Sequence, residues 1–139
     1  MKFSQQTIQQ MLDAYLVLDS GKTESSANFI YTFSESHNIY AQGYRAGDYY
    51  EIEITGEYFL TNPEHLEESG IKYLESLGWK VVPDGNFVCT VDKTYLENGD
   101  VAKLIWTSLG AYNTTLACLL YTSDAADEGL GVDLGGRRI

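Results

Sequence analysis

Three strand-like segments follow one another between residues 28 and 55, and very short connections join them. The segments are Asn28–Ser34, Asn38–Ala46 and Tyr49–Thr55, and the connections are Glu35 to His37 and the pair Gly47 and Asp48. Connections this short join antiparallel neighbours, because a parallel crossover needs about a dozen residues or more. The chain is therefore expected to fold around an antiparallel meander.

The residues before this meander have the pattern of an amphipathic helix. Ser4 is a residue type that caps helix N-termini, and Gly21 can end a helix. The apolar residues between them recur at helical spacing: Ile8, Met11, Leu12, Tyr15 and Leu16. The sequence therefore predicts a first helix with one apolar face.

Two further helices are expected after the meander. One is predicted to begin at Asn62, which can cap it, with Pro63 in its first turn, and to end at Gly78. Gly70 in its middle predicts a close approach of the helix backbone to the sheet, since glycine otherwise weakens a helix. The other helix is predicted to begin near Asn98.

Two more strands are predicted between these helices, at Trp79–Val82 and Asn86–Asp92, with a turn at Pro83. The expected element order is α-β-β-β-α-β-β-α. This order predicts a two-layer α+β fold with a mostly antiparallel, five-stranded sheet and three helices. Residues 1–117 are expected to form this single domain.

Residues 118–139 have a different origin in this interpretation. The stretch from Cys118 to Glu128 and the stretch from Val132 to Ile139 resemble translated sequencing-library adapter, and the gap between them has the length of a sample index. Such segments are excluded from fold reasoning. The genuine product is then expected to be residues 1–117, cut off at an unknown point, with Cys118 no part of it.

The charge balance narrows the classes of partner. The chain has 20 acidic and 9 basic residues, a formal charge of −11. Such a chain repels phosphate backbones, so nucleic acids and anionic membrane surfaces are not expected partners. No apolar run is long enough to cross a bilayer, the N-terminus is polar, and two cysteines make no disulfide framework. We therefore expect a cytoplasmic protein.

Residue types that carry chemistry are few. His37 and His65 lack Cys or His at ligand spacing and are interpreted as exposed imidazoles, and Cys89 as a small core residue. No metal or cofactor is expected. Glu51 and Glu53 share a strand face at about 7 Å, which suits a glycosidase-like pair, although solvated surface charges explain them too. The chain is accordingly expected not to be an enzyme.

Tyrosine is unusually frequent, with 11 copies in 139 residues. Tyr40 and Tyr44 share one face of the second strand, and Tyr49 shares a face with Glu51 and Glu53. If both rows lie on the side without helices, they form a tyrosine-plus-carboxylate surface suited to binding a protein or peptide. Tyrosine also has a high strand propensity, so an ordinary sheet face remains an alternative.

Trp106 is a second candidate contact. At helical spacing it lies about 140° from Val101, away from the apolar stripe of the last predicted helix. An outward tryptophan is typical of a dimer or partner contact, and a lone surface tryptophan remains an alternative. We therefore expect Trp106 to contribute to self-association.

Short motifs add a family resemblance over residues 27–113: Tyr58 to Thr61, Leu77-Gly78-Trp79, Pro83 and Gly85-Asn86-Phe87. With the three strands before them and the closing helix after, these motifs resemble the type III secretion chaperone and YbjN-like superfamily of peptide-binding chaperones. The resemblance implies a non-enzymatic cytoplasmic protein, often dimeric. It also implies that an extended segment of a partner is held by apolar grooves or added strands.

Three functions are thus open at this point. The first is a chaperone-like protein that binds a polypeptide client, basic by charge complementarity, through Tyr40, Tyr44, Tyr49, Glu51 and Glu53, with Trp106 for a homodimer. The second is an immunity- or inhibitor-type protein that blocks a basic partner with its acidic surface. The third is a carboxylate hydrolase built on the two glutamates.

Overall fold

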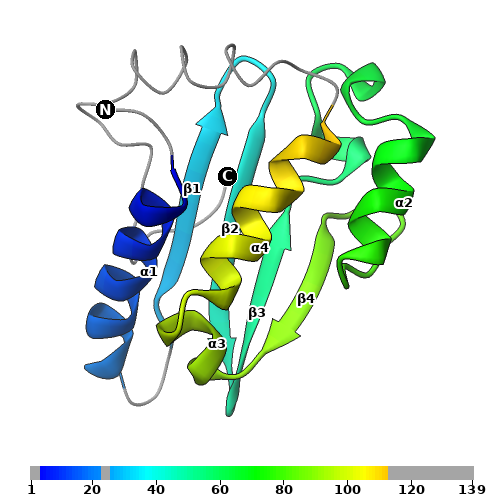
Figure 1. Cartoon of the computed structure of the whole chain (residues 1–139). Helices are drawn as coiled ribbons and strands as arrows, with labels where there is room; N and C mark the ends of the chain where they lie inside the picture. Colours follow the sequence, from blue (N-terminus) through cyan, green and yellow to red (C-terminus); the bar gives the residue numbers. More distant parts are fainter. Residues whose placement is uncertain (1–3, 23–25, 113–139) are drawn as a thin grey trace.

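Four strands form one antiparallel sheet in the computed structural model, which describes residues 4–22 and 26–112 (Figure 1). The strands are β1 (Asn28–Ser34), β2 (Ile39–Ala46), β3 (Tyr49–Ile54) and β4 (Phe87–Val91). Each strand pairs with the next in the order β1-β2-β3-β4. The predicted meander is confirmed. Residues 118–139, for which the sequence indicates an adapter, lie outside the described residues.

Four α-helices accompany this sheet in the described part of the chain, where the sequence predicted three. They are α1 (Gln5–Ser20), α2 (Glu68–Ser76), α3 (Lys93–Glu97) and α4 (Asp100–Ser108). Figure 1 shows them on one side of the sheet, with α4 across β2 and β3 and α2 beyond β4. The class is therefore α+β, as expected. The additional helix, α3, begins because Asp92 accepts a hydrogen bond from the Thr94 amide.

The first helix begins and ends where the sequence predicts. Ser4 and Thr7 form a capping box, in which each side chain accepts a hydrogen bond from the backbone amide of the other. The predicted apolar stripe is buried, and Ile8, Leu12 and Tyr15 have no exposed surface. Capping and burial thus agree on the limits and the orientation of α1.

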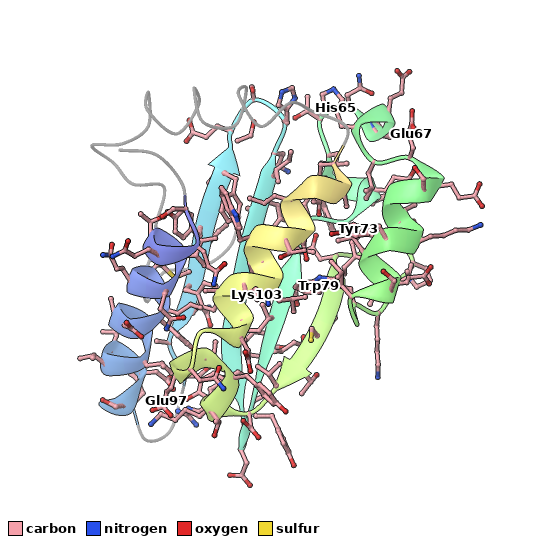
Figure 2. The ribbon with its side chains drawn as sticks, in the orientation of Figure 1. His65, Glu67, Tyr73, Trp79, Glu97 and Lys103 are labelled. Carbon is pink, nitrogen blue, oxygen red and sulfur yellow. The ribbon has the colours of Figure 1, made fainter. Side chains whose placement is uncertain are left out.

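The predicted strand Trp79–Val82 is not formed, so within the described part of the chain the sheet has four strands and not five. Only Lys80 pairs with Val88, as an isolated bridge. Trp79 is buried because its indole N–H donates to Ser108 Oγ of α4 at 2.8 Å, and Figure 2 shows it between α4 and α2. After the bridge, Val81 and Val82 are exposed, and Pro83 has no N–H for a ladder.

The segment after Asn62 also differs from the prediction. Asn62 caps only a 3-10 turn, Pro63–His65, and α2 begins at Glu68. Leu66 interrupts the helix with an extended backbone, and its side chain is 1% exposed. Gly70 does allow a close approach, but to the carbonyl of Ala111 in the last turn (Leu109–Ala111) and not to the sheet.

Aromatic side chains fill the space between the sheet and the helices. Tyr15 and Phe29 have ring centroids 5.0 Å apart, and Tyr31 stacks on Phe33 at 4.9 Å. At one end of this space lies the carboxylate of Asp19, which is 3% exposed and accepts a hydrogen bond from Arg45 Nε at 2.7 Å. The positive charge of Arg45 is therefore paired within the fold.

Candidate functional site

One face of the sheet carries no helix from residues 4–22 or 26–112, and the sequence-predicted site residues of β2 and β3 lie on it. Strand register places Tyr44 opposite Glu51, and Gln42 opposite Glu53. Because side chains alternate, Ile52 and the other core residues point to the helices while these point away. We call this surface the open face; it comprises Tyr40, Gln42, Tyr44, Tyr49, Glu51, Glu53, Val88 and Thr90.

The two glutamates of the open face are held by neighbouring side chains. The hydroxyl of Tyr44 donates to Glu51 Oε2 at 2.9 Å, and Gln42 Nε2 donates to Glu53 Oε1 at 2.8 Å. The hydrogen bond to Glu51 raises the pKa of Tyr44 above its ordinary value, because it favours the protonated phenol. Both carboxylates therefore have fixed positions before any partner arrives.

Asn86, just before β4, connects the open face to the loops beside it. Its Oδ1 accepts hydrogen bonds from the Tyr40 hydroxyl at 3.1 Å and from the Gly56 amide at 3.0 Å. Its Nδ2 donates to Glu53 Oε1 at 3.0 Å. Asn86 is itself buried, so these bonds are shielded from water.

This arrangement corrects the expected role of Tyr40. Its ring is 2% exposed, so it offers no contact area, whereas Tyr44 is 36% and Tyr49 is 56% exposed. The physical reason is the bond to Asn86, which fixes the phenol beneath the segment before β4. Tyr40 supports the site, while Tyr44 and Tyr49 remain available to a partner.

A groove of about 640 Å³ lies on the open face. Its floor is formed by side chains of β2, β3 and β4, including Glu51, Glu53 and Thr90. Phe59, Lys80 and Val82 form its wall. Most of the lining residues are polar or charged, and Phe59, Val82 and Val88 supply apolar side chains.

The outer edge of β4 borders this groove. Lys80 N donates to the Val88 carbonyl at 2.8 Å and Val88 N donates to the Lys80 carbonyl at 3.0 Å. Alternate residues of a strand present their backbone groups to the same side, so Thr90, two residues on, presents its N–H and C=O to this edge. Thr90 is also exposed. An extended segment could pair there.

The sequence did not indicate four exposed apolar residues near the groove as site residues. They are Tyr58 at 66%, Phe59 at 39%, Val81 at 48% and Val82 at 42% exposed. Tyr58 and Phe59 form an edge-to-face pair at 5.2 Å. Clustered exposed apolar side chains are typical of interaction surfaces. No local signal marks them, because Pro83 favours an extended backbone in the residue before it and so is compatible with the predicted strand.

Trp106 does not project freely from α4. Its side chain is half-buried and packs against the core cluster. Only the remaining part of the ring could contact a second chain. Its role in self-association stays a prediction.

The two histidines are less exposed than predicted, whereas Cys89 lies partly buried against the core, as expected. His37 and His65 are half-buried and in contact, with ring centroids 4.4 Å apart. Burial, together with the charge of His65, lowers the pKa of His37. Burial raises the pKa of the Cys89 thiol, which makes it a weak nucleophile. Among residues 4–22 and 26–112, no group of three His, Cys, Asp or Glu could hold a metal ion.

Comparison of the chain with protein-family models, curated proteins and solved structures gives no match. Within the part of the chain that the structure describes, no helix is both long enough and apolar enough to traverse a bilayer. The open face and its groove are therefore the features of the molecule that bear on its function.

Proposed function

We propose that this chain is a non-enzymatic, chaperone-like protein that binds an extended segment of a partner polypeptide on the open face. The observation that carries the proposal is the groove of about 640 Å³ on a sheet face without helices, bordered by the edge of β4. A strand edge supplies backbone hydrogen bonds to any extended peptide, and neighbouring side chains select among peptides.

The exposed side chains suit a polypeptide. Tyr44 and Tyr49 offer apolar area with a hydroxyl group, and Phe59 and Val82 add apolar area at the wall. Tyrosine loses little conformational entropy on binding because it has only two side-chain torsions. Such surfaces bind peptides of varied sequence at moderate affinity.

Charge favours a basic client. Glu51 and Glu53 lie on the groove floor, and the chain has a formal charge of −11. Lys80 on the wall is the cationic side chain among the described groove residues. Opposite charge accelerates association, and like charge disfavours acidic peptides.

The resemblance of residues 27–113 to secretion chaperones and YbjN-like proteins agrees with this proposal, and with it we propose a cytoplasmic location and a homodimer formed through Trp106. The free thiol of Cys89 is in keeping with a reducing compartment. An inhibitor of a folded basic partner is the alternative, favoured by the same acidic open face. A hydrolase is disfavoured because Glu51 and Glu53 each accept hydrogen bonds from neutral donors on an open surface.

The test is the affinity of an unstructured, lysine- and arginine-containing peptide, measured by fluorescence anisotropy with the wild-type chain and two variants. Thr90→Arg puts bulk and positive charge on the groove floor. Gln10→Arg adds the same charge on the exposed side of α1, far from the groove.

We expect micromolar binding by the wild type, a loss of about tenfold or more in T90R, and a change below about twofold in Q10R. Equal effects of both variants, or no binding of basic peptides, would contradict the proposal. Subnanomolar binding of one folded basic protein, with an on-rate that falls as salt rises, would instead support the inhibitor.

A further inference from the structure

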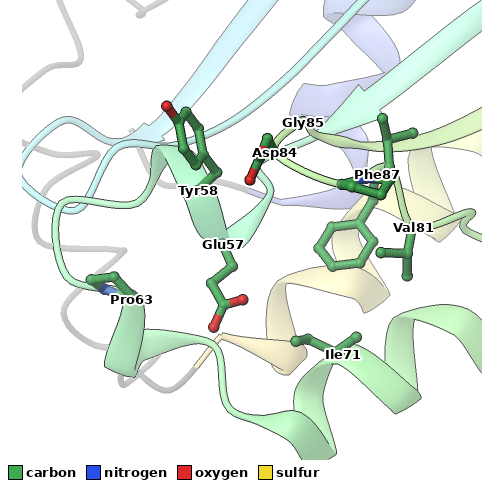
Figure 3. A pocket seen from close by; sticks show the side chains of 10 residues that line it. Glu57, Tyr58, Pro63, Ile71, Val81, Asp84, Gly85 and Phe87 are labelled. Carbon is green, nitrogen blue, oxygen red and sulfur yellow. The ribbon is translucent and has the colours of Figure 1, made fainter.

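A second hollow, of about 370 Å³, lies across the Val82–Gly85 turn from the groove (Figure 3). We call it the turn pocket. Val82 and Gly85 line both hollows, so the two are neighbours separated by this one turn. A chain bound in the groove could therefore place a side chain in the turn pocket.

The turn pocket combines apolar walls with two carboxylates. Ile71, Val81 and Phe87 form apolar walls, and Figure 3 shows the carboxylates of Glu57 and Asp84 directed toward the enclosed space. Among the described residues, no lysine or arginine lines it. Neither carboxylate has a hydrogen-bond or ion-pair partner within the described parts of the chain.

The backbone segments that carry the two carboxylates are fixed relative to each other. Gly56 packs directly on the Gly85 carbonyl, so closely that a Cβ at Gly56 would collide with it. Glu57 follows Gly56, and Asp84 precedes Gly85. Asn86 Oδ1 accepts from the Gly56 amide, and Gly85 N donates to the Val82 carbonyl, both at 3.0 Å. The acidic pair is thus carried by two segments locked together.

We propose that the turn pocket binds the cationic side chain, arginine or lysine, of a polypeptide held in the groove. This inference rests on the proposed function and adds a position-specific requirement to it. The aliphatic stem of the residue packs against Ile71 and Phe87, and its charged end meets Glu57 and Asp84. Tyr58, 66% exposed, offers its ring face to the same cation.

The experiment compares two peptides and two double variants. One peptide is unstructured and contains arginine; the other has citrulline in its place, which keeps the shape and removes the charge. Glu57→Gln with Asp84→Asn removes the acidic pair, and asparagine tolerates the positive φ of 58° at position 84. Glu75→Gln with Asp48→Asn removes the same charge from exposed positions elsewhere.

We expect the E57Q/D84N variant to bind the arginine peptide about tenfold more weakly than the wild type, and E75Q/D48N less than about twofold more weakly. The citrulline peptide should bind weakly and equally to the wild type and E57Q/D84N. Binding of the arginine peptide that depends on Thr90 but not on Glu57 and Asp84 would overturn this inference and leave the proposed function intact. Absence of binding to the wild type would overturn both.

Discussion

The two faces of this sheet use the same strands for different purposes. On the helix side, Phe29, Phe33 and Ile52 are buried at 1% exposure or less. On the open face, Tyr44 and Tyr49 remain exposed, and the polar groups beside them bind one another. Alternation along the strands thus places one set of residues in the core and leaves others, such as Tyr44 and Tyr49, on the surface that we propose to bind a polypeptide.

The faces also differ in what fixes their side chains. Close packing of rings determines positions on the helix side. On the open face, hydrogen bonds through Asn86 and the glutamates do so. For the binding that we propose, a surface held in this way would be ordered beforehand, which lowers the entropy cost of association.

The largest expected effect contrasts one aromatic residue from each face. Phe29→Ala should lower the free energy of unfolding by about 3–5 kcal/mol, because it removes a fully buried ring and leaves a cavity. Tyr49→Ala should change it by less than about 0.5 kcal/mol, since the ring is 56% exposed. Urea denaturation measures both. Similar losses in the two variants would break the contrast between the faces.

A smaller loss of stability is expected from a substitution at Asn86, which connects the open face to the loops beside it. Asn86→Ala removes three hydrogen bonds and leaves the Gly56 amide without its acceptor, at a cost of about 2 kcal/mol in the free energy of unfolding. Peptide binding should weaken as well, because Glu53 loses one of its donors. Unchanged stability together with unchanged binding would show that packing, and not this network, orders the open face.

The smallest expected effect is a dependence of stability on pH at the histidine pair. The pKa of His37 is lowered in the folded chain, so below about pH 6.5 the unfolded chain binds the proton more readily. The free energy of unfolding should therefore fall as the pH drops through that region. His37→Gln should show a shallower fall between pH 7.5 and 5. An identical slope in both proteins would show that carboxylates elsewhere govern acid stability.

Local patterns predicted much of this architecture. The limits of α1 and of the strands between residues 28 and 55 follow from capping, alternation and short connections, which all act between near neighbours. The placement of Tyr44, Tyr49, Glu51 and Glu53 on one face follows from the same alternation.

Long-range contacts explain what the sequence did not predict. Trp79 lies outside the sheet and donates to Ser108 in α4, and the hydroxyl of the buried Tyr40 donates to Asn86, 46 residues later. No spacing rule indicates such partners. The turn pocket likewise depends on the contact between Gly56 and Gly85, which only the folded chain creates.

The most direct test of the open face as a polypeptide-binding surface is a map of amide chemical shifts in the 15N-labelled chain during titration with an unstructured basic peptide. The account predicts concentration-dependent shifts at Gln42, Glu51 and Thr90, with Gln10 on α1 unchanged. Shifts confined to the helix side of the molecule, or none at saturating peptide, would contradict it.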